Sequence, residues 1–118
     1  MGFLDFLFGH RVSMNDATVY LEGGISKAKA NDLEGALKDL NNAIKIDPKL
    51  AEAYCYRGIV KAVTGNRPKA IADFSKAIDI RPDYDYAYSF RAQAKEDGGD
   101  IQGAKADRRR CYELRKKI

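Results

Sequence analysis

The chemically reactive side chains of this 118-residue chain are few, and their spacing assembles no catalytic group. His10 is the only histidine, so we expect neither a histidine-activated nucleophile nor a histidine-containing metal site. Cys55 and Cys111 lack the CxxC spacing of redox and zinc sites, and we expect free thiols in a reducing compartment. No glycine-rich phosphate-binding loop occurs. These residues argue against an enzyme and predict no metal and no cofactor.

Charged side chains, in contrast, recur at a fixed spacing. Arg57 and Arg91 lie 34 residues apart, and so do Asp39 and Asp73. Because 18 residues separate Asp39 from Arg57 and also Asp73 from Arg91, we expect the ion pairs Asp39–Arg57 and Asp73–Arg91. Each pair would join two successive structural units and set their stacking register.

The same 34-residue period runs through the apolar and small residues. Ala36, Leu40, Ala43 and Pro48 recur as Ala70, Phe74, Ala77 and Pro82, while Tyr20 recurs as Tyr54 and Tyr88. A fixed period of this length indicates an array in which each repeat is one supersecondary unit. We therefore divide the chain into a leader (1–16) and three repeats (17–50, 51–84 and 85–118).

Each repeat is expected to contain two helices. Apolar and small residues recur at steps of three and four, which is helix periodicity rather than strand alternation. Asn31-Asp32, Gly65-Asn66 and Gly98-Gly99-Asp100 fall at the middle of the repeats, where they can end one helix and cap the next. Pro48 and Pro82 end the second helix of their repeats. The pattern predicts six helices of about 12–16 residues each.

These residues resemble the tetratricopeptide repeat family, whose pattern places a large aromatic residue, Gly or Ala, Ala, Phe, Ala and Pro at fixed offsets. The second repeat matches at Tyr54, Gly58, Ala70, Phe74, Ala77 and Pro82, whereas the third has Arg108 and Cys111 in place of Phe and Ala. The resemblance implies an all-α fold, a right-handed superhelical stack of three antiparallel helix pairs. It also implies a scaffold or adaptor that binds proteins or peptides.

In this family, ligands mostly contact the first helix of each pair, which lines the concave face of the stack. The resemblance assigns a peptide-binding groove to Leu21, Ile25, Cys55, Tyr56, Ile59, Tyr86, Phe90 and Gln93. Such a mainly apolar groove suits an amphipathic helix or an extended peptide with aliphatic or aromatic anchors. The alternative is that some of these side chains, Ile59 among them, belong to the core between helices.

Some family members hold the C-terminal carboxylate of chaperones with Lys, Asn and Arg side chains. The residues at the corresponding places here are Leu21, Ile25, Tyr56, Tyr86 and Phe90. None of them supplies the charge-assisted hydrogen bonds that a carboxylate requires. The sequence therefore argues against a carboxylate clamp.

The leader is strongly apolar, with Phe3, Leu4, Phe6, Leu7 and Phe8 in close succession. Three destinations for it stay open: the groove of its own or a neighbouring copy, the edge of the first repeat, or a membrane surface. A disordered leader is the remaining alternative. Besides the peptide-binding scaffold, two alternative functions therefore stay open. One is a membrane-tethered adaptor, and the other is a module that self-associates through residues 3–8. No secretory signal or membrane span is evident, so we expect a cytoplasmic protein, with a peripheral place at the inner face of a membrane as the alternative.

Positive charge is concentrated at the C-terminal end. The chain has a net charge of +4. Residues 101–118 hold seven basic and two acidic side chains. No RNA-binding motif accompanies them, and a charged terminal helix is usually a solvated cap, so nucleic acid is not the partner that we expect. In such a cap Arg108, Arg109 and Arg110 would face water, while Ile101, Ala104, Cys111 and Leu114 would pack inward.

Overall fold

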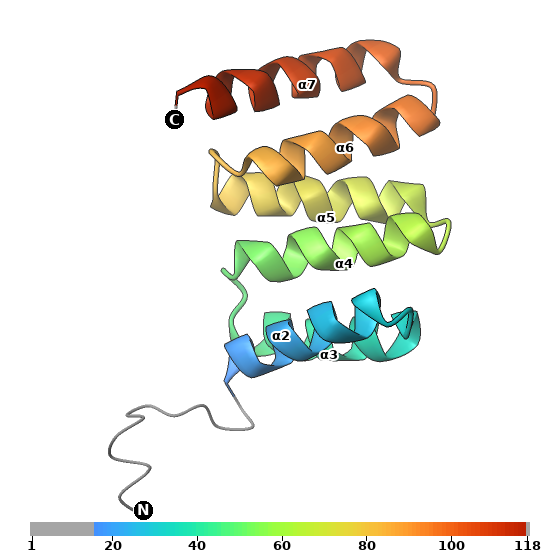
Figure 1. The fold of residues 1–118 in the computed structure, drawn as a ribbon, viewed down its shortest axis with the longest axis vertical. Helices are drawn as coiled ribbons and strands as arrows, with labels where there is room; N and C mark the ends of the chain where they lie inside the picture. The colour runs from blue at the N-terminus through green and yellow to red at the C-terminus, as the bar shows by residue number, and fades with distance from the viewer. Residues whose placement is uncertain (1–15, 118) are drawn as a thin grey trace, which may run out of the picture.

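The computed structural model describes residues 16–117, which form six α-helices and no strand. The helices are α2 (Ala17–Lys29), α3 (Leu33–Ile46), α4 (Ala51–Val63), α5 (Arg67–Ile80), α6 (Asp85–Asp97) and α7 (Ile101–Lys116). Helices α4 to α7 follow one another along the long axis in chain order, with α7 at one end, and α2 and α3 overlap at the other end of the stack (Figure 1). The predicted all-α stack of three helix pairs is confirmed. The hypotheses on residues 3–8 lie outside the described residues.

The turn within each helix pair repeats the same backbone conformation. One residue in each turn has a positive φ: Asn31 (65°), Gly65 (90°) and Gly99 (92°). Glycine adopts this conformation without strain, and asparagine tolerates it better than most residues. The next residue then caps the second helix, because the side chains of Asp32, Asn66 and Asp100 accept a hydrogen bond from a backbone N–H of its first turn. The predicted helix ends and helix caps at the middle of each repeat are thus confirmed.

The helices of the second pair approach closely at Gly58. A Cβ atom at this position would lie 2.7 Å from Cε1 of Phe74, and Phe74 is only 1% exposed. The ring of Phe74 in turn stacks on Phe90 of α6, with 6.0 Å between the ring centroids. One small residue in α4 therefore fixes the position of two aromatic rings, the second of which belongs to the next repeat.

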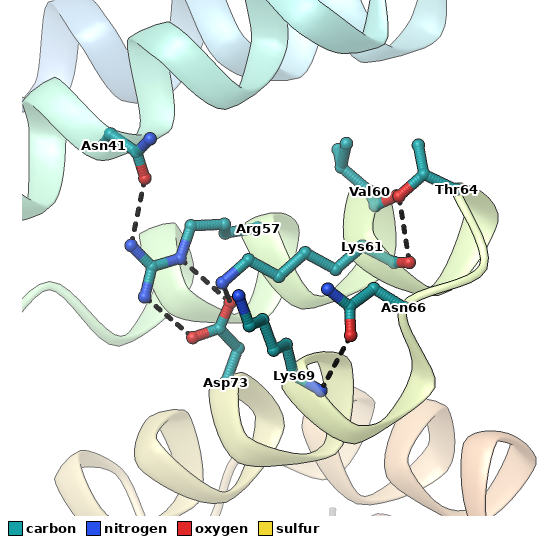
Figure 2. A network of polar contacts seen from close by, with 8 residues as sticks. All are labelled: Asn41, Arg57, Val60, Lys61, Thr64, Asn66, Lys69 and Asp73. Carbon is teal, nitrogen blue, oxygen red and sulfur yellow. Dashed lines mark hydrogen bonds and ion pairs between the residues drawn. The ribbon is translucent and has the colours of Figure 1, made fainter.

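The predicted ion pairs Asp39–Arg57 and Asp73–Arg91 are wrong. Arg57 instead binds Asp73 of its own repeat through Nε and Nη2, at 2.9 and 2.8 Å (Figure 2). Arg91 binds Asp107 in the same way, with both distances 2.8 Å. Lys61 and Lys95 add a second cation to these two aspartates, each at 3.1 Å.

The arginines still join successive repeats, but through neutral acceptors. Nη1 of Arg57 donates to Oδ1 of Asn41 at 3.0 Å (Figure 2). Nη1 of Arg91 donates to Oγ of Ser75 at 3.1 Å. Asn41 follows Asp39 by two residues, a rotation of about 200° around the helix, so the two side chains point in nearly opposite directions. Asn41 consequently reaches Arg57, while Asp39 points back toward α2.

The first repeat lacks the arginine of the other two, because Gly23 stands in its place. Asp39 lies close against this glycine, since a Cβ atom on Gly23 would be 2.7 Å from Oδ2 of Asp39. Lys27 supplies the only ion pair of Asp39 among residues 16–117, at 2.8 Å. Each repeat therefore neutralises its own aspartate, and only the second and third do so with arginine.

The last helix, α7, has the expected polar outer side. Arg108 and Arg109 are exposed, while Ala104 and Cys111 are buried. The expectation that Ile101 packs inward is wrong, because its side chain is 46% exposed. Ile101 is the first residue of α7, and no helix of the described chain lies beyond this end of the stack to cover it.

We predict that Gly58→Val lowers the free energy of unfolding by about 1–3 kcal/mol, because the added atoms overpack a ring that cannot retreat into solvent. The matched control is Ala62→Val, at an exposed position of the same helix. Urea unfolding followed by circular dichroism measures both. Because valine is a better helix former than glycine, a Gly58→Val chain at least as stable as the unmodified chain would show that the close approach is unimportant.

A second prediction concerns the buried carboxylate of α7. Burial alone raises the pKa of Asp107, but hydrogen bonds from Arg91 and Lys95 outweigh it and hold the pKa below its ordinary value of 3.8. The folded chain thus binds this proton less readily than the unfolded chain. The stabilisation is therefore complete above the unfolded pKa of about 4 and is lost as the pH falls through the lower folded value.

Asp107→Asn should accordingly reduce the free energy of unfolding by about 1–3 kcal/mol near neutral pH, and the loss should shrink below about pH 4. Urea titrations across this range measure the effect, with Asp83→Asn as the control at an exposed carboxylate. A difference between Asp107→Asn and the unmodified chain that does not change with pH would contradict the assignment.

Candidate functional site

An apolar pocket lies between α4 and α6 and includes the residue before α6. It has a volume of about 180 Å³. The residues that line it are Cys55, Tyr56, Ile59, Tyr84, Tyr86 and Phe90. A cavity of about 150 Å³ in another protein holds benzene, so this pocket can take one aromatic or branched aliphatic side chain. Five of the eight residues predicted for the groove come together here.

Two walls of the pocket are open to solvent. Tyr86 is 59% exposed and Phe90 is 39% exposed, although both are large aromatic residues. Phe90 is held from behind by its stacking on the buried Phe74. Exposed aromatic side chains in a hollow are typical of a surface that another molecule covers.

Arginine side chains support the tyrosine walls. The Arg81 guanidinium lies 3.9 Å from the ring centroid of Tyr84, and that of Arg115 lies 5.2 Å from the centroid of Tyr86. Arg115 comes from α7 and donates from Nε to Oδ2 of Asp85 at 2.8 Å. This pairing lowers the pKa of Asp85, with the Arg115 hydrogen bond as the largest cause. The last helix thus helps to position a pocket residue of α6.

Cys55 forms a chemically inert part of the pocket. Its side chain is 2% exposed. Burial raises the pKa of the thiol from 9.0 to about 11, while the Tyr84 hydroxyl and Arg81 oppose the shift and Glu52 adds to it. Burial likewise raises the pKa of Tyr84. Both groups stay neutral near pH 7, so they serve as lining rather than as a nucleophile and a base.

The other three predicted groove residues lie elsewhere. Leu21 is buried in the core between α2, α3 and α4, and Ile25 packs against the same cluster. Gln93 is exposed and donates to Oδ1 of Asp97 at 2.9 Å, without lining the pocket. The hollow is therefore confined to the second and third repeats.

Sequence reasoning missed Tyr84. The family resemblance assigns groove positions only to the first helix of each pair, whereas Tyr84 is the residue that precedes α6. Its register equivalent is Leu50, which precedes α4 and packs against the core. The large apolar residue at both places is a signal that the residue before the first helix of a pair also packs on the face of that helix.

Three further findings concern metal ligands, membrane spans and the cysteines of the described residues. Residues 16–117 contain no cluster of three or more His, Cys, Asp or Glu side chains that could hold a metal ion. Within the same range, no helix combines the length and the apolar character that crossing a membrane requires. Cys55 and Cys111 are free and buried, as expected for unpaired thiols.

Comparison with known proteins gives a consistent result. A family model described as a TPR repeat matches residues 26–65. The tetratricopeptide-repeat domain of Arabidopsis OM64 superposes with a TM-score of 0.84 at 27% identity, over 89% of this chain and 87% of that chain. The chain has the tetratricopeptide-repeat fold, and residues 26–65 match the family itself. The tetratricopeptide repeat is a fold of protein-interaction domains.

Two further solved structures share this tetratricopeptide-repeat architecture. The TPR2B domain of yeast Sti1, in a complex with pHsp70, has a TM-score of 0.84 at 26% identity, over 90% of this chain and 84% of that chain. The crystal structure of MamA has a TM-score of 0.83 at 27% identity over 89% of this chain. The present chain spans 61% of that MamA chain. Among curated protein sequences, none gives a significant match.

The raised pKa of Cys55 leads to a prediction for this protein. In a Cys111→Ala variant, alkylation of Cys55 by iodoacetamide should be slow near pH 7 and should rise about tenfold per pH unit up to about pH 10. Alanine is the residue at the equivalent places of the other two repeats, Ala43 and Ala77. Mass spectrometry of quenched samples measures the rate.

The same variant in denaturant provides the control, since its alkylation should be fast and should level off near the ordinary thiol pKa of 9.0. A native rate that levels off at that same pH would mean that Cys55 is solvated, which would contradict its place in the pocket.

Proposed function

We propose that this protein is a peptide-binding scaffold that anchors its partner by inserting one apolar side chain into the pocket between α4 and α6. The observation that carries the proposal is an open hollow of about 180 Å³ walled by Tyr86 and Phe90, which are exposed. Covering these two rings removes apolar surface from water, which contributes about 25 cal/mol per Å² to binding. Aromatic residues in such pockets commonly supply most of the binding free energy.

The similarity to the Sti1 domain supports a protein or peptide partner, because that domain was solved in complex with pHsp70. The pocket of the present chain calls for a different kind of contact. Tyr56, Tyr86 and Phe90 stand where the family's carboxylate clamp has amide or basic side chains. They form an apolar surface, which suits the side chain of an internal peptide segment better than a terminal carboxylate.

We predict that Tyr86→Ala and Phe90→Ala each weaken peptide binding by about tenfold or more, as expected for aromatic residues at the centre of an interface. The probes are peptides selected on the immobilised full chain from a phage-displayed random library, then synthesised with neutral ends. Fluorescence polarisation gives the dissociation constants.

The matched control is Tyr112→Ala. Tyr112 is 65% exposed and has the Lys116 ammonium 5.6 Å from its ring centroid, so it resembles Tyr86 in exposure and in cationic neighbour. It lies on α7 and does not line the pocket. If no peptide is enriched, or if all three variants bind the selected peptides equally well, the pocket is not the binding site and the proposal fails.

A further inference from the structure

Two acidic side chains on α2 and α4 occupy positions that the 34-residue register places on the same helix face as the pocket residues. Glu22 of α2 is the equivalent of Tyr56 and Phe90, which line the pocket from α4 and α6. Glu52 of α4 is the equivalent of Tyr86. Both carboxylates are exposed. The groove face thus changes from aromatic to acidic on passing from α6 toward α2.

Glu52 is also close to the pocket in space, because it lies one helical turn before Cys55 and Tyr56 on α4. Its negative charge contributes to the raised pKa of Cys55 and of Tyr84, although burial is the main cause for both. No ion pair involves Glu52 or Glu22 within residues 16–117. Two other acidic groups of this region are already neutralised, since Asp85 binds Arg115 and Glu96 binds Arg108.

The basic side chains of this region do not cancel the two glutamates. Arg81 stacks on Tyr84, and Arg115 is engaged by Asp85 and Tyr86. Lys29 at the end of α2 is basic, but its equivalent at the end of α6 is the acidic Asp97. Glu22 and Glu52 therefore leave an unbalanced negative charge on the α2 and α4 part of this face.

We propose that the partner is a basic peptide segment, in which an uncharged apolar side chain fills the pocket and Lys or Arg side chains lie against Glu52 and Glu22. The inference rests on the proposed function and adds the chemical class of the partner. An anionic segment is disfavoured on the same grounds, because it would place like charges beside two exposed carboxylates.

The test uses the same library selection on the full chain and asks for the residues that flank the apolar anchor. We expect enrichment of Lys and Arg on one side of it. For a selected peptide, Glu52→Lys and Glu22→Lys should each weaken binding about five- to tenfold, and added salt should weaken binding to the unmodified chain.

Glu34→Lys is the matched control, because Glu34 is an exposed carboxylate at the second position of α3, as Glu52 is at the second position of α4. It should leave the affinity within about twofold of the unmodified chain. Selected peptides with neutral or acidic flanks, or equal effects of Glu34→Lys and Glu52→Lys, would overturn the inference.

Failure of the inference is distinguishable from failure of the proposed function. If the selected peptides lack basic flanks but still lose affinity with Phe90→Ala, the pocket binds peptides and only the charge assignment is wrong. If basic peptides are selected whose binding depends on Glu52 but not on Phe90, the apolar anchor is wrong and so is the proposal that depends on it.

Discussion

The close approach of α4 and α5 at Gly58 is the constraint on which the pocket depends. Because Gly58 has no side chain, the ring of Phe74 can lie directly against the backbone of α4, where it is almost completely buried. Phe90 stacks on that ring from the next repeat and presents its other side to the pocket. A core contact within one repeat therefore sets the position of a wall that is open to solvent in the next. The core and the pocket wall share the same two rings, so a change at Phe74 should affect both.

The arginine–aspartate contacts stabilise the stack in a different way. Arg57 and Arg91 each use two nitrogens for the aspartate of their own repeat and one for a neutral oxygen of the preceding repeat. Most of the charge is thus satisfied locally, and the junction between repeats needs only one hydrogen bond. At junctions of this kind a neutral acceptor avoids burying a second carboxylate next to the first, which would cost electrostatic free energy. The first repeat has no preceding neighbour among the described residues, and Gly23 in place of arginine fits that position.

The groove residues divide into three groups that the sequence does not separate. Tyr56, Ile59, Tyr86 and Phe90 line the hollow, and Cys55 forms its buried part. Leu21 and Ile25 occupy the same register positions as Cys55 and Ile59 and are buried to a similar degree, but they pack in the core of the first pair without lining the hollow. The last group is Gln93, which is exposed and bound to Asp97. Equivalent positions in a repeat share a direction on the helix, but only some of them line the hollow.

The sequence by itself determined the helices, their pairing and their order, because a 34-residue period, helix-spaced small residues and capping turns are all local or periodic signals. The family resemblance also indicated most of the aromatic pocket, although only Tyr56 and Phe90 of its lining share a place in the period. Only the tertiary structure decided which aspartate each arginine binds. Separations of 16 and 18 residues together make one period, so the pattern fits both pairings equally well. The choice depends on the rotation of α3 and α5 about their own axes, and packing against neighbouring helices fixes that rotation. The same is true of Tyr84, which joins the pocket because the chain enters α6 there, at a position that helix periodicity does not describe.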